Sequence, residues 1–239
     1  PDFLCKAMPF HNVLHFYLLP LLLEHRRLLG REDFLVSPCN IEVIEWIDIY
    51  PDWYGNNGIV VLGDKCSGKT HLSWLFSEKS GAKVYRISEI KDEIFSDIVP
   101  IESALVIDDI DKAVGDYEME ENLFHIINYA IECNTKMFFT TSKPLVNLDF
   151  KIVDLKTRLL SFPVANIYVP DDDLLKALLV KQFMERGIIV APDVIEFIVK
   201  HIERNPSSVK ELVERADLLS FEEKKRITIP FVKKIIEEM

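Results

Sequence analysis

Short apolar runs alternate with longer amphipathic stretches between residues 37 and 170 of the chain. Stretches 37–50, 69–80 and 121–134 have the spacing of helices. Strands that alternate with helices in this way indicate βαβ units and a parallel sheet covered on both faces. Five runs predict the strands by their β-branched and aromatic content: GIVVL (58–62), AKVYRI (82–87), ALVIDDID (104–111), KMFFTTSKP (136–144) and ANIYVP (165–170).

The pattern changes after Pro170, where four helical segments follow one another without an intervening strand. Asp, Pro or Thr stands at the start of each, as is typical of helix N-termini. We therefore predict an α/β domain over 31–170 and a small helical domain over 171–239. Residues 1–30 are interrupted by prolines and form a third part, an N-terminal extended segment.

Composition narrows the function classes. The 239 residues carry a formal net charge of −11, which disfavours a broad electrostatic grip on nucleic acid. The four cysteines form no CxxC pair and the six histidines show no metal-ligand spacing, so a reducing cytoplasm fits better than a disulfide framework or a zinc site. The apolar run FYLLPLLL (16–23) is too short to span a bilayer, and we expect no membrane association.

The strongest chemical signal is the spacing G-x-x-x-x-G-K-[ST], between the first predicted strand and the helix after it. Backbone N–H groups of such a loop cradle phosphate oxygens, the lysine reaches the β- and γ-phosphates, and the threonine hydroxyl coordinates Mg²⁺. The motif and the next residue give the candidate nucleotide ligands Gly63, Asp64, Lys65, Cys66, Ser67, Gly68, Lys69, Thr70 and His71.

Acidic and polar residues end two further strands. Asp108 is expected to hold Mg²⁺ together with Thr70, and Asp109 to orient the attacking water. Ser142 ends the next strand, where it would point at the γ-phosphate or simply form a turn. Arg158, in the segment DLKTRL, is by pattern alone a surface ion-pair residue.

The order of the P-loop, VIDDID, TTSKP, DLKTRL and a helical lid resembles the AAA+ module of the bacterial replication initiator DnaA. The similarity is closer to the shorter relative Hda and covers roughly residues 17–239. The resemblance implies a five-stranded parallel sheet with ATP or ADP and Mg²⁺ between sheet and lid. It places adenine near Leu35, Val36 and Asn40, makes Ser142 the sensor I residue, and makes Arg158 an arginine finger that acts on another subunit's nucleotide.

Hda-type proteins are adaptors that, bound to the DNA polymerase III sliding clamp, stimulate hydrolysis of ATP by DnaA. The resemblance therefore implies a negative regulator of replication initiation, with DnaA and the clamp as partners and no sequence-specific DNA-binding domain after the lid. The clamp motif of the family begins with glutamine. Here the matching stretch is LLPLLL, with Leu18 at the glutamine position and Leu19, Leu21 and Leu23 as its apolar part.

Three alternatives stay open at this level. The chain is an adaptor with at most weak ATPase activity, an autonomous AAA+ motor or helicase loader, or a nucleotide-stabilised binding module. The lid bears on this choice, because the family's sensor II arginine aligns with Ser207, and Arg204 lies one turn earlier. The apolar N-terminal run either docks on a partner or packs on the domain, and a homo-oligomer is a further alternative.

Overall fold

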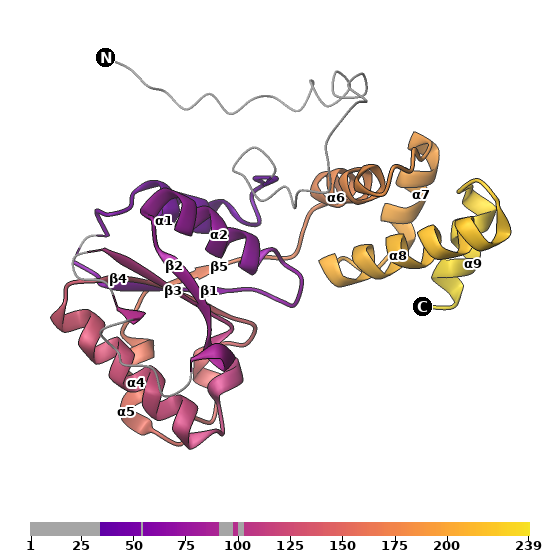
Figure 1. Cartoon of the computed structure of the whole chain (residues 1–239). Helices are drawn as coiled ribbons and strands as arrows, with labels where there is room; N and C mark the ends of the chain where they lie inside the picture. The colour runs from indigo at the N-terminus through magenta and orange to yellow at the C-terminus, as the bar shows by residue number, and fades with distance from the viewer. Residues whose placement is uncertain (1–33, 54, 91–97, 100–102) are drawn as a thin grey trace, which may run out of the picture.

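The computed structural model describes residues 34–53, 55–90, 98–99 and 103–239. An α/β layer structure is followed by a helical unit, drawn in orange and yellow (Figure 1). No helix in these ranges combines the length and the apolar content needed to cross a membrane.

The sheet has five parallel strands in the order β2-β3-β4-β1-β5, which confirms the predicted fold class. The fifth strand is shorter than its predicted range 165–170. Ile167 still donates its N–H to Leu62 of β1, but the Tyr168 N–H turns to the carbonyl of Cys39. The strands are β1 (Gly58–Leu62), β2 (Lys83–Arg86), β3 (Ala104–Asp108), β4 (Lys136–Thr141) and β5 (Val164–Asn166).

Helices cover both faces of the sheet (Figure 1). Alternate residues of one strand enter different cores: Val61 packs with α1 (Ile41–Asp48) and α2 (Lys69–Ser80), whereas Val60 packs with α4 (Tyr117–Glu132) and α5 (Val153–Leu160). This alternation is the period of two expected of a strand. Short 3₁₀ helices lie in the described connections: η3 (Ile87–Glu89), η4 (Ile110–Ala113) and η5 (Leu145–Asn147).

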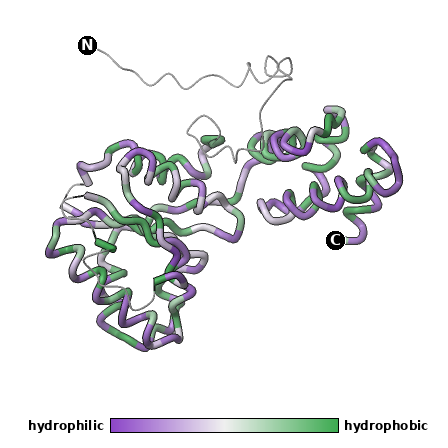
Figure 2. The backbone as a smooth tube through the Cα atoms, in the orientation of Figure 1, coloured by the Kyte–Doolittle hydropathy of each residue, from purple (hydrophilic) through white to green (hydrophobic). Residues whose placement is uncertain are grey.

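The C-terminal unit is a lid of four helices with its own apolar core. Figure 2 shows hydrophobic residues, in green, recurring along these helices. Two of its helices start with the expected capping chemistry, since Asp171 and Asn205 each accept a backbone N–H of the helix that follows. The lid consists of α6 (Asp172–Glu185), α7 (Pro192–His201), α8 (Pro206–Glu223) and α9 (Ile229–Glu237).

One carboxylate in the larger core has a purely structural set of partners. Glu120 of α4 is fully buried, and its two oxygens accept the N–H groups of Gly115, at 2.8 Å, and Ile152, at 2.9 Å. Gly115 follows η4, and Ile152 is the residue immediately before α5. Glu120 therefore joins three elements on the same face of the sheet.

We expect Glu120→Ala to lower the free energy of unfolding by about 2–4 kcal/mol, because the N–H groups of Gly115 and Ile152 lose the charged acceptor that joins them. Chemical denaturation followed by circular dichroism measures this. Glu121→Ala is the matched control, since Glu121 is the exposed neighbour in the same helix. Equal stability of the two variants would contradict the assignment.

Candidate nucleotide-binding site

The loop after β1 has the backbone that phosphate binding requires. Gly68 and Cys66 have φ values of +99° and +61°, in the left-handed region, and α2 begins directly after Gly68. A side chain at Gly63 would place its Cβ 2.6 Å from Ser67 Oγ and 3.0 Å from Ile167 Cβ, so both neighbours would have to shift to admit it. These conformations turn the loop around the N-terminus of α2, where helix N–H groups favour an anion.

Lys69 is almost completely buried inside this loop. Its Nζ donates to the carbonyls of Gly63 and Asp64, both at 2.7 Å. Burial lowers the pKa of Lys69, and the nearby carboxylates of Asp109 and Asp111, with weaker partners, oppose that shift. The ammonium group is therefore held at the inner side of the loop, as expected of the phosphate-binding lysine.

Thr70 and Asp108, the predicted Mg²⁺ pair, are in direct contact. Asp108 is 1% exposed, and its carboxylate accepts hydrogen bonds from Thr70 Oγ1 at 2.9 Å, from Ser73 Oγ at 3.2 Å and from Thr140 Oγ1. Carboxylate and hydroxyl oxygens are the hard ligands that Mg²⁺ prefers. These two residues would hold the ion, which would supply charge neutralisation at the phosphates.

The other polar groups at the strand ends pair with one another. Asp109 bonds Lys112 Nζ at 2.5 Å, and its N–H donates to Thr140 Oγ1 at 2.8 Å. Ser142 donates both its hydroxyl and, at 3.2 Å, its N–H to the carboxylate of Asp111. Sequence reasoning missed Lys112 and Asp111, although Asp111 is the third acid of the VIDDID segment that drew attention to Asp108.

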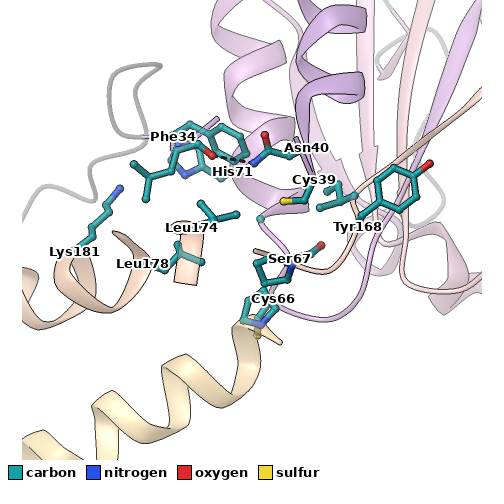
Figure 3. Close-up of a pocket in the computed structure, with 15 residues that line it drawn as sticks. Phe34, Cys39, Asn40, Cys66, Ser67, His71, Tyr168, Leu174, Leu178 and Lys181 are labelled. Atoms are coloured by element: carbon teal, nitrogen blue, oxygen red, sulfur yellow. Dashed lines mark hydrogen bonds between the residues drawn. The ribbon is translucent and has the colours of Figure 1, made fainter. Parts of the chain in front are cut away.

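A cavity of about 120 Å³ lies between the loop, the segment before α1 and lid helix α6. Leu35 and Asn40 line it, as predicted for adenine neighbours, and Asn40 Nδ2 donates to the Leu35 carbonyl at 2.9 Å (Figure 3). Val36 is not among the lining residues and is 40% exposed. The volume is below the roughly 300–1,000 Å³ of usual ligand pockets, so the cavity in this conformation is too small for a whole nucleoside.

The loop contributes a buried hydroxyl that fits a phosphate. Ser67 Oγ is inaccessible to solvent and has no hydrogen-bond partner among the described residues. Buried polar atoms in proteins are nearly always hydrogen-bonded, and a phosphate oxygen would satisfy this one. Among the predicted loop residues Cys66, Ser67, Gly68 and His71 line the cavity, whereas Asp64 and Lys65 are exposed.

The lid meets the loop at one hydrogen bond, from Ser207 Oγ to the carbonyl of Lys65 at 3.2 Å. Arg204 bonds Asp172 at 2.7 Å and is not among the residues that line the cavity. The lid cation that does line it is Lys181 of α6, which sequence reasoning did not single out (Figure 3). No local pattern marks Lys181, because only the packing of lid against loop places it there.

Arg158 lies outside this constellation. It is exposed on α5, which packs on the face of the sheet opposite to α2, and no described residue pairs with its guanidinium group (Figure 1). The surface ion pair that pattern alone suggested is thus absent from the described residues. Leu18, Leu19, Leu21 and Leu23 of the apolar run lie outside the described residues.

Comparisons with known proteins agree with this geometry. Residues 171–236 match the family model described as the lid domain of Hda. A Haemophilus influenzae protein described only as uncharacterized is 25% identical over 77% of this chain and 91% of its own length. The match confirms the predicted resemblance to Hda-type proteins over residues 171–236, the lid.

Solved structures show the fold. Domain III of the replication initiation protein DnaA from Thermotoga maritima superposes with a TM-score of 0.73 at 16% identity, covering 88% of this chain and 96% of that one. AMPPCP-bound DnaA from Aquifex aeolicus superposes with a TM-score of 0.65 at 17% identity, covering 80% of this chain and 65% of that one. The Thermotoga maritima RuvB branch migration motor superposes with a TM-score of 0.57 at 18% identity, covering 76% of this chain and 61% of that one.

We expect Lys69→Ala to weaken ADP binding about 100-fold in calorimetry, since charge-assisted hydrogen bonds contribute about 1.5–3 kcal/mol and each 1.4 kcal/mol is tenfold. Lys65→Ala removes the same charge from the same loop. The Lys65 side chain is exposed, so that variant is expected to bind within about threefold of wild type. Equal losses in both variants would remove the specific role of Lys69.

Proposed function

We propose that this chain, an AAA+ protein of the Hda and DnaA type, negatively regulates replication initiation by promoting hydrolysis of ATP bound to DnaA. In this proposal it binds ATP or ADP with Mg²⁺ at its own P-loop. Arg158 is presented to the nucleotide of DnaA, where it acts in trans. Such a regulator would act in the cytoplasm.

The observation that carries the proposal is the position of Arg158. The Arg158 side chain is exposed, and no ion-pair partner for its guanidinium group lies among the described residues, so another protein can reach this group. Its helix packs on the sheet face opposite to α2, the helix that starts at the P-loop. A role in trans therefore agrees better with this placement than a role at the chain's own phosphates.

The helix that bears Arg158 is anchored at both ends of its first turn. Glu120 accepts the Ile152 N–H, and Lys156 Nζ donates to the carbonyls of Val146, at 3.1 Å, and Leu148, at 2.7 Å. Arginine fingers act by stabilising charge that develops on the transferring phosphoryl group, which requires accurate placement. The two anchors support such placement.

The rival function is an autonomous AAA+ ATPase that works as an initiator or helicase loader. The contact between Thr70 and Asp108 favours it, because a Mg²⁺ pair of this kind permits hydrolysis at the chain's own site. The pairing of Asp109 with Lys112 opposes it, since the carboxylate expected to orient water is already engaged. We therefore expect weak intrinsic ATPase activity.

Arg158→Ala is expected to lower the stimulation of DnaA's ATPase by about 10³–10⁵-fold, the usual contribution of an arginine finger. A phosphate-release assay with ATP-loaded DnaA and DNA-loaded clamp measures this. The variant should keep its fold and its own ADP affinity, because no described residue depends on the guanidinium group.

Lys151→Ala is the charge-matched control, since Lys151 is exposed shortly before α5 and is expected to leave stimulation unchanged. Arg158→Lys keeps the charge but loses the planar fork and should restore little activity. Full stimulation by Arg158→Ala would refute the finger. Loss of the chain's own ATPase, measured without DnaA, would instead support the motor.

We also propose that Leu18, Leu19, Leu21 and Leu23 bind the sliding clamp as an extended apolar segment, as Pro20 disfavours a continuous helix. Replacing Leu21 and Leu23 by alanine should weaken clamp binding in surface plasmon resonance by about tenfold or more, while ADP affinity is unchanged. Unchanged clamp binding, or unfolding of the variant, would contradict this docking role.

A further inference from the structure

Asp111 and Ser142 meet at the end of the sheet, although neither motif analysis nor the comparisons assign any role to Asp111. Asp111 lies in η4, directly after β3, and Ser142 follows β4. Because β3 and β4 are parallel neighbours, their following residues come to the same edge. The Asp111 carboxylate accepts the Ser142 hydroxyl on one oxygen and the Ser142 N–H, at 3.2 Å, on the other.

In this contact Ser142 can only be the hydrogen-bond donor and Asp111 only the acceptor. A serine hydroxyl has one proton to donate, and an ionised carboxylate can only accept. Phosphate oxygens are also acceptors. While Ser142 donates to Asp111, the hydroxyl therefore presents only lone pairs to its other neighbours and cannot stabilise a γ-phosphate.

Asp111 also lies close to the phosphate-binding lysine. Its negative charge is one of those that act on Lys69 Nζ, together with Asp109 and Asp108. The contact with Ser142 lies beside the phosphate loop, because the N–H of Gly63, the first residue of that loop, donates to the carbonyl of Thr141 at 3.2 Å. Asp111 is also only partly buried, so its carboxylate does not need Ser142 as a partner in order to be solvated.

We propose that Asp111 is a positioning residue that holds the Ser142 hydroxyl away from a bound γ-phosphate, and so lowers this chain's own preference for triphosphate over diphosphate. The inference rests on the proposed nucleotide site and deepens it. It gives a physical reason for a regulator that binds a nucleotide yet hydrolyses it slowly. Ser142, the residue that would contact the γ-phosphate, instead donates its hydroxyl hydrogen bond to Asp111.

Binding measurements on four proteins test this: wild type, Asp111→Ala, Ser142→Ala and the double variant. Calorimetry gives the affinities for ADP and for a non-hydrolysable ATP analogue, with Mg²⁺ present. Asp111→Ala is expected to raise the ratio of analogue affinity to ADP affinity about tenfold, the effect of one charge-assisted hydrogen bond. Its intrinsic ATPase rate should rise as well.

The double variant separates this effect from simple charge removal, which would favour the triphosphate whether or not Ser142 is present. If Asp111 acts through Ser142, the tenfold gain disappears when Ser142 is already alanine. An equal gain in both backgrounds would overturn the proposal, and so would no gain in either. Amide hydrogen exchange gives an independent readout, because the Ser142 N–H should exchange faster in Asp111→Ala.

The outcomes also distinguish this inference from the proposed function. Nucleotide binding without coupling between positions 111 and 142 would refute the role of Asp111 alone. Failure of all four proteins to bind either nucleotide would refute the nucleotide site and the role of Asp111 with it. Stimulation of DnaA is tested separately at Arg158, and its failure would refute the proposed function without bearing on the coupling between positions 111 and 142.

Discussion

The candidate site depends on the hydrogen bonds that the buried carboxylate of Asp108 accepts. This carboxylate joins β3 to α2 through Thr70 and Ser73 and to β4 through Thr140, all by hydroxyl donors. A carboxylate that is 1% exposed would be costly without such partners. Because the donors come from two different elements, the same bonds fix the start of α2 against the sheet. The position of the phosphate loop follows from that contact.

Much of this arrangement could be predicted from the sequence, since the deciding signals are local. Apolar β-branched runs produce strands such as Gly58–Leu62 at the expected residues, and glycine spacing defines the loop that surrounds Lys69. Asp108 could be placed because it ends such a run. The predicted fifth strand extends too far, to residue 170. The Tyr168 N–H leaves β1 and donates to the carbonyl of Cys39, a residue distant in sequence, and the local pattern of residues does not reveal such a contact.

The unpredicted groups all depend on contacts between distant elements. Asp111, which meets Ser142, lies in η4, which begins directly after Asp109, a residue with a positive φ of 61°. Lys181 enters the cavity lining only through lid packing, and Val36 points elsewhere although its neighbour Leu35 lines the cavity. Residue type and spacing along the chain do not show which distant residues come into contact. The sequence therefore supplies the parts of the site, and the fold decides which of them pair.

The anchoring of α5 has a consequence for how a partner would be met. A helix of eight residues is too short to persist in water by itself, so its order must come from tertiary contacts. Glu120 and Lys156 supply these contacts within the chain, before any partner arrives. In the proposed complex the Arg158 side chain would lose conformational freedom, at a cost of about 2 kcal/mol or less, whereas its helix is already ordered and adds no further ordering cost. A low ordering cost of this kind would suit the proposed regulator if each of its molecules acts on several molecules of its target in turn.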